Sequence, residues 1–317
     1  MTDKKKKIIC LMGPTASGKT PLAVELVQKF PCEIVSVDSA MVYRGMDIGT
    51  AKPDAETLKI APHRLINICD PAKAYSAGRF RVDALREIND IHASGKIPLL
   101  VGGTMLYFRV LLQGIADLPR ADEVIRSALK KRAEREGWEV LHTELTRVDP
   151  AAAAKIHSND AHRIQRALEV FQLTGKLISN LQRDDTSPLA DFDILQIALM
   201  PSERKVLHDK IAQRFQMMLD AGFVDEVKAL YARGDLSHDL PSIRSVGYRQ
   251  AWDYLAGNID EKTMRESAIA ATRQLAKRQM TWLRTWPDCH YLDSELPSLV
   301  PHTSRLISSF FNTQYNQ

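Results

Sequence analysis

The sequence predicts an α/β protein: a parallel, P-loop NTPase-like sheet flanked by helices, with an all-α insertion. Three observations support this prediction. Apolar runs alternate with helical patterns up to residue 103. The first run leads into GPTASGKT at 13–20, a phosphate-loop pattern. From 121 to 183 the periodicity is helical only. We therefore predict an α/β core over 1–120 and 184–317, and a helical domain over 121–183.

The strands of the core are short apolar runs. KIICLMG ends at the phosphate loop, CEIVSVDS contains Asp38 near its end, and HRLINICD and KIPLLVGG follow. Nearly continuous apolar runs of this kind are typical of strands buried on both faces. A helix is predicted over 77–95, because its apolar residues recur mostly every three or four positions and Gly95 provides a stop.

The second half of the chain is mainly helical. After the insertion, DFDILQIALMP is predicted to be a strand that returns to the sheet. Helical patterns follow over 202–222, 223–234 and about 260–285, and CHYLDS is a candidate edge strand.

Composition narrows the class of protein. The net charge of +4 is too small to prove a nucleic-acid partner. The four cysteines match no zinc spacing, which favours reduced thiols in a cytoplasmic protein. The apolar run IICLM is too short for a signal peptide or a membrane span. We expect no membrane association and, since no oligomerisation seam is evident, a monomer.

The phosphate loop has residues that suit anion binding. Gly13 and Gly18 let backbone N–H groups turn toward phosphate oxygens, and the following helix adds its positive dipole. Lys19 supplies a charge, and the Thr20 hydroxyl is a candidate ligand for Mg²⁺ or for phosphate. The predicted diphosphate- or nucleotide-binding residues are Gly13, Pro14, Thr15, Ala16, Ser17, Gly18, Lys19 and Thr20. These residues also suit a kinase or an ATPase in which Asp38 holds Mg²⁺.

Further motifs give a more specific indication. Four motifs accompany the phosphate loop: DSAMVYRGMDIGTAKP at 38–53, VGGTMLYF at 101–108, RSVGYRQAW at 244–252 and ATRQLAKRQMTWLR at 271–284. Together they resemble the tRNA dimethylallyltransferase family, also called tRNA isopentenyltransferases, from about residue 8 to about 286. The resemblance implies transfer of a dimethylallyl group from dimethylallyl diphosphate to the exocyclic amino group of the adenosine just 3′ of the anticodon. The phosphate loop would then hold the departing pyrophosphate.

The resemblance also implies three catalytic residues. Asp38 matches the family's general base, with a Mg²⁺ ligand or a helix N-cap as the alternatives. Thr104 matches a residue of the reaction channel, and its alternative is an N-cap for the helix MLYFRVLL. Arg126 matches an arginine that reaches the site from the inserted helices; its alternative is a solvated helix charge.

The resemblance implies that the DSAM segment at 38–41 and three stretches, at 162–166, 244–249 and 277–284, contact tRNA. Each stretch contains arginine, and basic clusters suit an RNA backbone. Ala40 and Met41 replace the polar pair found in some relatives, which removes polar readout there. The implied contacts are Asp38, Ser39, Ala40, Met41, His162, Arg163, Ile164, Gln165, Arg166, Arg244, Ser245, Val246, Gly247, Tyr248, Arg249, Lys277, Arg278, Gln279, Met280, Thr281, Trp282, Leu283 and Arg284.

Other functions remain compatible with parts of the sequence. An adenylate isopentenyltransferase would share the phosphate loop, but a free nucleotide needs neither the helical insertion nor the basic helix. A small-molecule kinase or ATPase predicts consumption of ATP. An RNA-binding module without chemistry would not need Lys19, Thr20 and Asp38 together.

Overall fold

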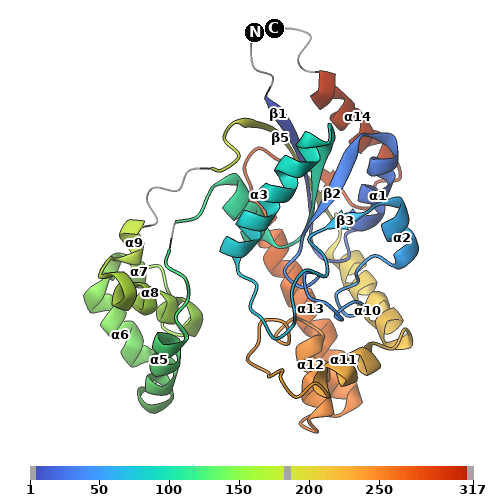
Figure 1. Cartoon of the computed structure of the whole chain (residues 1–317). Helices are drawn as coiled ribbons and strands as arrows, with labels where there is room; N and C mark the ends of the chain where they lie inside the picture. Colours follow the sequence, from blue (N-terminus) through green and yellow to red (C-terminus); the bar gives the residue numbers. More distant parts are fainter. Residues whose placement is uncertain (1–4, 117, 182–186, 313–317) are drawn as a thin grey trace. The chain divides into compact units, whose positions relative to one another are not determined.

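The computed structural model describes residues 5–116, 118–181 and 187–312, and it forms two compact units (Figure 1). Unit 1 comprises residues 1–110 and 191–317, and unit 2 comprises residues 111–190. The predicted boundary between residues 120 and 121 lies inside unit 2, and the one between 183 and 184 lies outside the described residues.

Within the described residues, unit 1 is built on a six-stranded sheet in which every pairing is parallel. The strands are β1 (Lys6–Met12), β2 (Cys32–Val37), β3 (His63–Arg64), β4 (Ile97–Gly102), β5 (Phe192–Met200) and β6 (His290–Asp293). Their order in the sheet is β3-β2-β4-β1-β5-β6, so the chain crosses over between non-adjacent strands. The predicted parallel sheet flanked by helices is confirmed.

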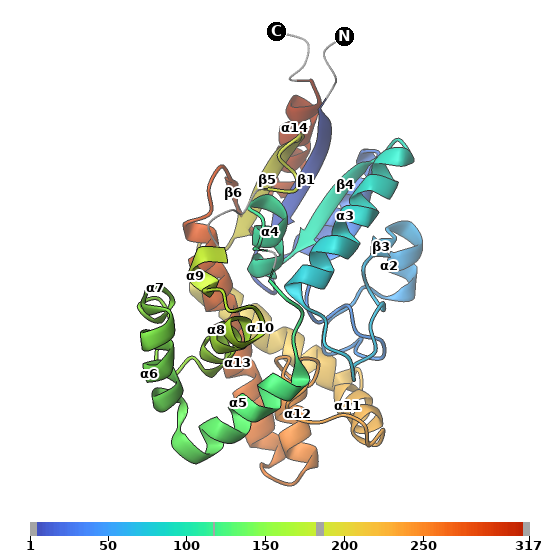
Figure 2. The same ribbon diagram turned by 60° about the vertical axis from the view of Figure 1, so that its left-hand side comes forward.

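Helices bury both faces of this sheet. Ile9 and Leu11 of β1 share a core with α1 (Lys19–Lys29) and α14 (Leu299–Asn312). The intervening residues of β1 point the other way and are fully buried too. On that opposite face lies α3 (Ala77–Ala93), as Figures 1 and 2 show. The nearly continuous apolar runs of the sequence follow from this two-sided burial.

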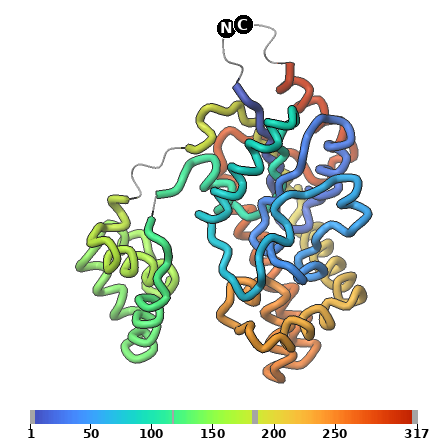
Figure 3. Tube along the Cα trace, in the orientation of Figure 1, coloured from blue at the N-terminus to red at the C-terminus, as the bar shows by residue number. Residues whose placement is uncertain are grey.

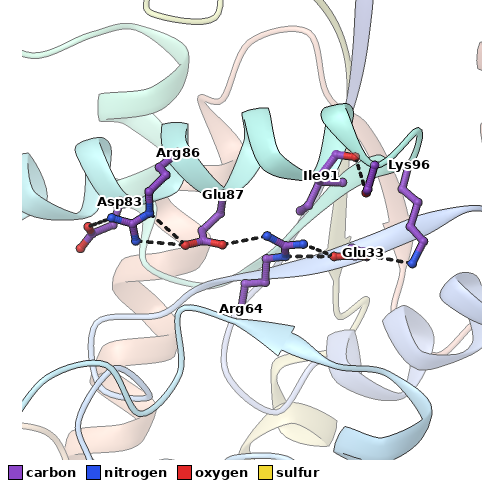
Figure 4. A network of polar contacts seen from close by, with 8 residues as sticks. Glu33, Arg64, Asp83, Arg86, Glu87, Ile91 and Lys96 are labelled. Atoms are coloured by element: carbon purple, nitrogen blue, oxygen red, sulfur yellow. Dashed lines mark hydrogen bonds and ion pairs between the residues drawn. The ribbon is translucent and has the colours of Figure 1, made fainter.

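The edge strand β3 is shorter than predicted. The run over residues 63–70 was expected to be a strand, but only two residues pair with β2. Leu65 and Asn67 have φ angles of 63° and 57°, a left-handed backbone that ends the strand. Arg64 anchors the short strand through ion pairs with Glu33 of β2 and Glu87 of α3, at 2.6 and 2.9 Å (Figure 4).

The carboxyl-terminal helix α14 completes the core, a role that no sequence motif indicated. Phe311 packs edge-to-face on Phe30 with ring centroids 5.7 Å apart. The Lys7 ammonium donates to the carbonyl of Phe310 at 2.6 Å, at the end of α14, where the helix dipole is negative. The segment is therefore structural, because it covers one face of the sheet.

The remaining helices of unit 1 lie mostly near the carboxyl ends of the strands, where loops of parallel sheets form sites (Figure 2). These helices are α2 (Ala55–Ile60), α4 (Met105–Leu112), α10 (Arg204–Asp220), α11 (Phe223–Tyr231), α12 (Tyr248–Leu255) and α13 (Glu261–Arg284). Leu207 and Ile211 of α10 form a small core with Ala276 and Met280 of α13.

Helices are the regular secondary structure of unit 2 among its described residues, and the unit has its own core, which includes Leu141, Leu145 and Ile164. Gly137, at φ 88°, separates two helices where the sequence suggested continuous helical periodicity. The helices are α5 (Glu123–Glu136), α6 (Trp138–Val148), α7 (Pro150–Ala153), α8 (Ala161–Thr174) and α9 (Ile178–Leu181). Among the described residues of both units, no helix combines the length and apolarity needed to cross a membrane.

Candidate active site

Unit 1 contains a cavity of about 900 Å³ near the carboxyl ends of the central strands. Its walls include the phosphate loop, the loops after β2 and β4, helix α10, residues 241–248 and helix α13. Thr15 to Thr20, Asp38 and Thr104 all line it. One cavity thus brings together Asp38, Thr104 and the predicted phosphate-loop residues from Thr15 to Thr20, whereas Gly13 and Pro14 do not line it.

The phosphate loop has the geometry of an anion cradle. Gly18 has a left-handed φ of 81° at the start of α1, and its neighbour Ala16 is also left-handed at 63°. Gly13 is required for space, because a Cβ there would lie 2.9 Å from the carbonyl oxygen of Leu199. The Lys19 ammonium donates to the carbonyl of Pro14 at 2.6 Å, so the lysine is folded back over the loop.

Lys19 and Arg214 are among the cations that line this cavity. Burial first, and the Arg214 guanidinium second, lower the pKa of Lys19 to about 7, although Asp38 acts in the opposite direction. The pKa of Arg214 is itself lowered by burial, again with Asp38 opposing. A bound anion would relieve this repulsion, so the pair favours a phosphate-bearing ligand.

Asp38 and Thr104 meet through Ser39. Asp38 Oδ1 accepts hydrogen bonds from the amides of Ala40 and Met41, at 2.8 and 3.2 Å. Thr104 Oγ1 accepts from the Ser39 amide at 3.1 Å. The Thr104 hydroxyl therefore fixes the loop that carries Asp38. Neither the predicted place in the reaction channel nor the alternative N-cap role included this contact. Asp38 is half-buried at the cavity wall, within reach of a ligand.

A carboxylate holds another wall of the cavity in place. Glu226 Oε2 accepts from the amides of Asp47 and Ile48, both at 2.7 Å, and Oε1 accepts from the Gly49 amide at 3.1 Å. The Tyr248 hydroxyl also donates to Glu226 Oε1, at 2.5 Å. In Figure 3 the blue trace that carries residues 47–49 lies beside the orange helices α11 and α12, which carry Glu226 and Tyr248. A Cβ on Gly49 would lie within 2.6 Å of the rings of Phe223 and Tyr248.

The stretches of unit 1 implied to contact tRNA divide into exposed and buried side chains. Leu283 is fully buried and Met280 is 4% exposed, so these two side chains pack in the core. Tyr248 is fully buried too and lies at the cavity wall. Gly247 is buried as well. Ser245, Val246, Gln279 and Trp282 are half-buried and line the cavity, whereas the exposed residues are Ser39, Arg244, Arg249, Lys277, Arg278, Thr281 and Arg284.

In unit 2, the predicted residues are organised around a buried carboxylate. Glu169 is fully buried, and it accepts from Arg126 at 2.9 Å and from Arg166 at 2.7 Å. Arg126 is therefore not the solvated helix charge that was its alternative. Gln165 donates to the Arg126 carbonyl at 2.9 Å, and Ile164 lies in the core of the unit. His162 and Arg163 are exposed.

Comparison with known proteins identifies the family. A family model described as IPP transferase matches residues 41–286, more than three quarters of the chain. The chain belongs to the IPP transferase family. A full-length tRNA isopentenylpyrophosphate transferase from Bacillus halodurans is 37% identical, with 98% of each chain covered and a TM-score of 0.71.

Two further solved structures agree with this assignment. A tRNA isopentenylpyrophosphate transferase from Staphylococcus epidermidis is 34% identical, over 98% of this chain and 100% of that one, with a TM-score of 0.70. A eukaryotic dimethylallyltransferase acting on tRNA is 29% identical, over 97% of this chain and 80% of that one, with a TM-score of 0.81. The resemblance drawn from the motifs is confirmed.

Among the cavity residues of this IPP transferase that sequence reasoning missed is the cation Arg214. It lies on α10 three residues after the buried Ile211 and next to the buried Phe215. A cation at that spacing on an otherwise apolar helix face is the signal that could have revealed it. Without the fold, the face cannot be assigned to a cavity, because an arginine can also extend along a helix surface to reach water.

Proposed function

We propose that this IPP transferase moves a dimethylallyl group from dimethylallyl diphosphate to the exocyclic amino group of the adenosine just 3′ of the anticodon in tRNA. One observation carries the proposal: a single cavity holds the phosphate loop, the cations Lys19 and Arg214, and the carboxylate of Asp38. An anion site beside a candidate base suits a reaction in which a diphosphate leaves as an amine attacks.

The diphosphate would occupy the cationic side of the cavity. Amide groups of residues 15–20 and the amino-terminal end of α1 supply donors, and Lys19 and Arg214 supply charge. On binding, the Lys19 ammonium would leave the Pro14 carbonyl for a phosphate oxygen, and its pKa would rise. Negative charge grows on the leaving oxygen in the transition state, so these groups would stabilise it most at that point.

Asp38 would accept the proton of the amine. The bond between the allylic carbon and the diphosphate oxygen breaks, a carbon–nitrogen bond forms, and one amine proton moves to the Asp38 carboxylate, leaving pyrophosphate. The Ala40 and Met41 amides hold Oδ1, which fixes the direction of the carboxylate. A positioned base of this kind contributes about 10²–10⁴-fold to the rate.

Mg²⁺ fits the donors at the phosphate loop. The Thr20 hydroxyl lies in the first turn of α1 and lines the cavity. The described residues contain no cluster of three or more His, Cys, Asp or Glu side chains that could hold a metal by themselves, so diphosphate oxygens would supply part of the coordination. When bound, Mg²⁺ would neutralise charge on the diphosphate.

The exposed cations suit the RNA. Arg244, Lys277 and Arg278 lie at or beside the cavity wall, and unit 2 adds Arg163. Phosphate contacts from such residues position an RNA, and a base must leave its stack to enter the cavity.

We also propose that the protein is a monomer that acts in the cytoplasm. Light scattering of the purified protein would test its oligomeric state.

A transfer assay tests the activity. The protein is incubated with Mg²⁺, radiolabelled dimethylallyl diphosphate and an anticodon stem-loop, with parallel reactions containing AMP or ATP. Label in the stem-loop supports the proposal. Label in AMP would instead identify an adenylate isopentenyltransferase, and release of ADP without label transfer would identify a kinase or ATPase.

Two variants test the base. Asp38→Asn keeps an oxygen for the Ala40 and Met41 amides but removes the basic carboxylate, and Asp38→Ala removes both. Both should lower the transfer rate by about 10²–10⁴-fold. Full activity in Asp38→Asn would show that Asp38 only shapes the loop.

A further inference from the structure

The side chain of Gln279 connects two loops of the cavity. Its Oε1 accepts a hydrogen bond from the Thr15 amide at 2.9 Å, and its Nε2 donates to the Gly103 carbonyl at 2.8 Å. Thr15 belongs to the phosphate loop, and Gly103 immediately precedes Thr104. One half-buried amide on α13 therefore ties both loops to the same helix.

The connection continues to the loop that carries Asp38. The Thr104 amide donates to the Val37 carbonyl at 3.3 Å, and Thr104 Oγ1 accepts from the Ser39 amide at 3.1 Å. These two contacts flank Asp38. Gln279 thus stands between the anion side of the cavity and the side that holds the candidate base.

Little space remains beside Gly103, where the two loops approach each other. A Cβ on Gly103 would lie 2.5 Å from Gln279 Nε2 and 3.0 Å from the Gly13 carbonyl oxygen. The space beside Gly103 is filled by the glutamine amide and by the phosphate loop itself. If the amide moved, both loops would lose the partner that fixes their separation.

The bonds also require an amide in one orientation. The oxygen of Gln279 faces an N–H group and its nitrogen faces a carbonyl, so each end meets a complementary partner. A glutamate would place an oxygen opposite the Gly103 carbonyl. The exposed neighbours Lys277 and Arg278 have side chains available to RNA, whereas both polar ends of Gln279 bond to the protein.

We propose that Gln279 is a positioning residue for the diphosphate site, which it aligns with the Thr104 and Asp38 loops, and that it does not read the RNA. The identity of the ligands rests on the proposed function. The role differs from the tRNA contact that the motif at 277–284 implied for this position.

Equilibrium titration of the full chain separates these roles. Gln279→Met keeps the length of the side chain, removes both hydrogen bonds and adds no charge. Its dissociation constants for inorganic pyrophosphate with Mg²⁺, and for the anticodon stem-loop, are compared with those of the wild type. Gln274→Met, at an exposed position of the same helix, is the matched control. Gln279→Glu keeps the oxygen that accepts from the Thr15 amide, but it places a second carboxylate oxygen opposite the Gly103 carbonyl.

We expect Gln279→Met and Gln279→Glu to weaken pyrophosphate binding about tenfold or more, the loss of two hydrogen bonds, with unchanged binding of the stem-loop. Unchanged pyrophosphate affinity in Gln279→Met would overturn the proposal, whatever the RNA affinity does. An equal loss for both ligands would also overturn it, because that result indicates general destabilisation.

The experiment includes a replacement variant and a readout that does not depend on activity. If Gln279→Met does not fold, Gln279→Asn replaces it, since one missing methylene prevents the amide from reaching both loops. The pyrophosphate titration needs no catalytic turnover. A wild type that fails to transfer label would refute the proposed function, while the titration would still decide the role of Gln279.

Discussion

Replacement of Glu226 by glutamine tests how strongly one carboxylate shapes the cavity. Glu226 accepts four hydrogen bonds, three from consecutive amides of residues 47–49 and one from the Tyr248 hydroxyl. Burial and the Glu226 charge raise the pKa of Tyr248 well above its usual range, so the phenol stays a donor at every working pH. Gly49, Thr50 and Ala51 line the cavity, so this clamp positions one wall.

The size of the effect follows from the donors that lose a partner. Glutamine has nearly the same shape, but its NH₂ group would face two donors of the clamp. A hydrogen bond to a charged group contributes about 1.5–3 kcal/mol. Because the loop is partly exposed and water replaces some of the contacts, we expect Glu226→Gln to lower the free energy of unfolding by about 2–3 kcal/mol.

The assay is urea unfolding followed by tryptophan fluorescence, which comes from Trp252, Trp282 and Trp286 of unit 1 and from Trp138 of unit 2. Asp225→Asn is the matched control on the same helical turn, because its side chain is 80% exposed and its ion pair with Lys228 lies at the surface. The control should change stability by less than about 0.5 kcal/mol. If Glu226→Gln unfolds at the same urea concentration as the control, the clamp contributes nothing and the reasoning fails.

Three further predictions follow from buried contacts. The pKa of Lys19, about 7, lies below that of an unfolded lysine, so the unfolded state binds more protons between pH 7 and 10 and stability should rise with pH there. Unfolding by urea at several pH values measures the slope of the free energy of unfolding against pH. Added pyrophosphate, or the variant Lys19→Met, should flatten this slope. The same slope in Lys19→Met as in the wild type would show that Lys19 is not its source. Glu169→Gln should destabilise unit 2 by about 2–3 kcal/mol in thermal unfolding, because it leaves Arg126 without its buried counter-charge, and an unchanged transition would show that the pair is dispensable. Gly103→Ala should lose both pyrophosphate affinity and transfer activity, since its Cβ would collide with Gln279, and retained affinity would show that the loop can yield.

Local signals in the sequence were sufficient for much of the fold and part of the site. The phosphate loop combines glycines, a lysine and a flanking strand and helix, so its structure follows from neighbouring residues. Asp38 could be placed because parallel strands end at the same edge of a sheet. The cavity contains both, together with Thr104.

Contacts between distant segments could not be predicted from local sequence patterns. The run at 63–70 has strand-like composition, but left-handed residues at 65 and 67 stop the pairing. The helix over 299–312 was missed because its apolar residues make sense only against the core that they complete. In the same way, Arg214 and Glu226 act on loops more than 150 positions away, which no local pattern records.

The motif at 277–284 shows why a family pattern over-assigns a single role. A helix turns by 100° per residue, so eight consecutive residues face every direction. Here Met280 and Leu283 face the core, Gln279 and Trp282 face the cavity, and Lys277, Thr281 and Arg284 face solvent. A string shared by relatives can therefore preserve three requirements at once: a packed helix, an aligned cavity and a basic surface. Each position must be tested against the ligand that its own face of α13 can reach.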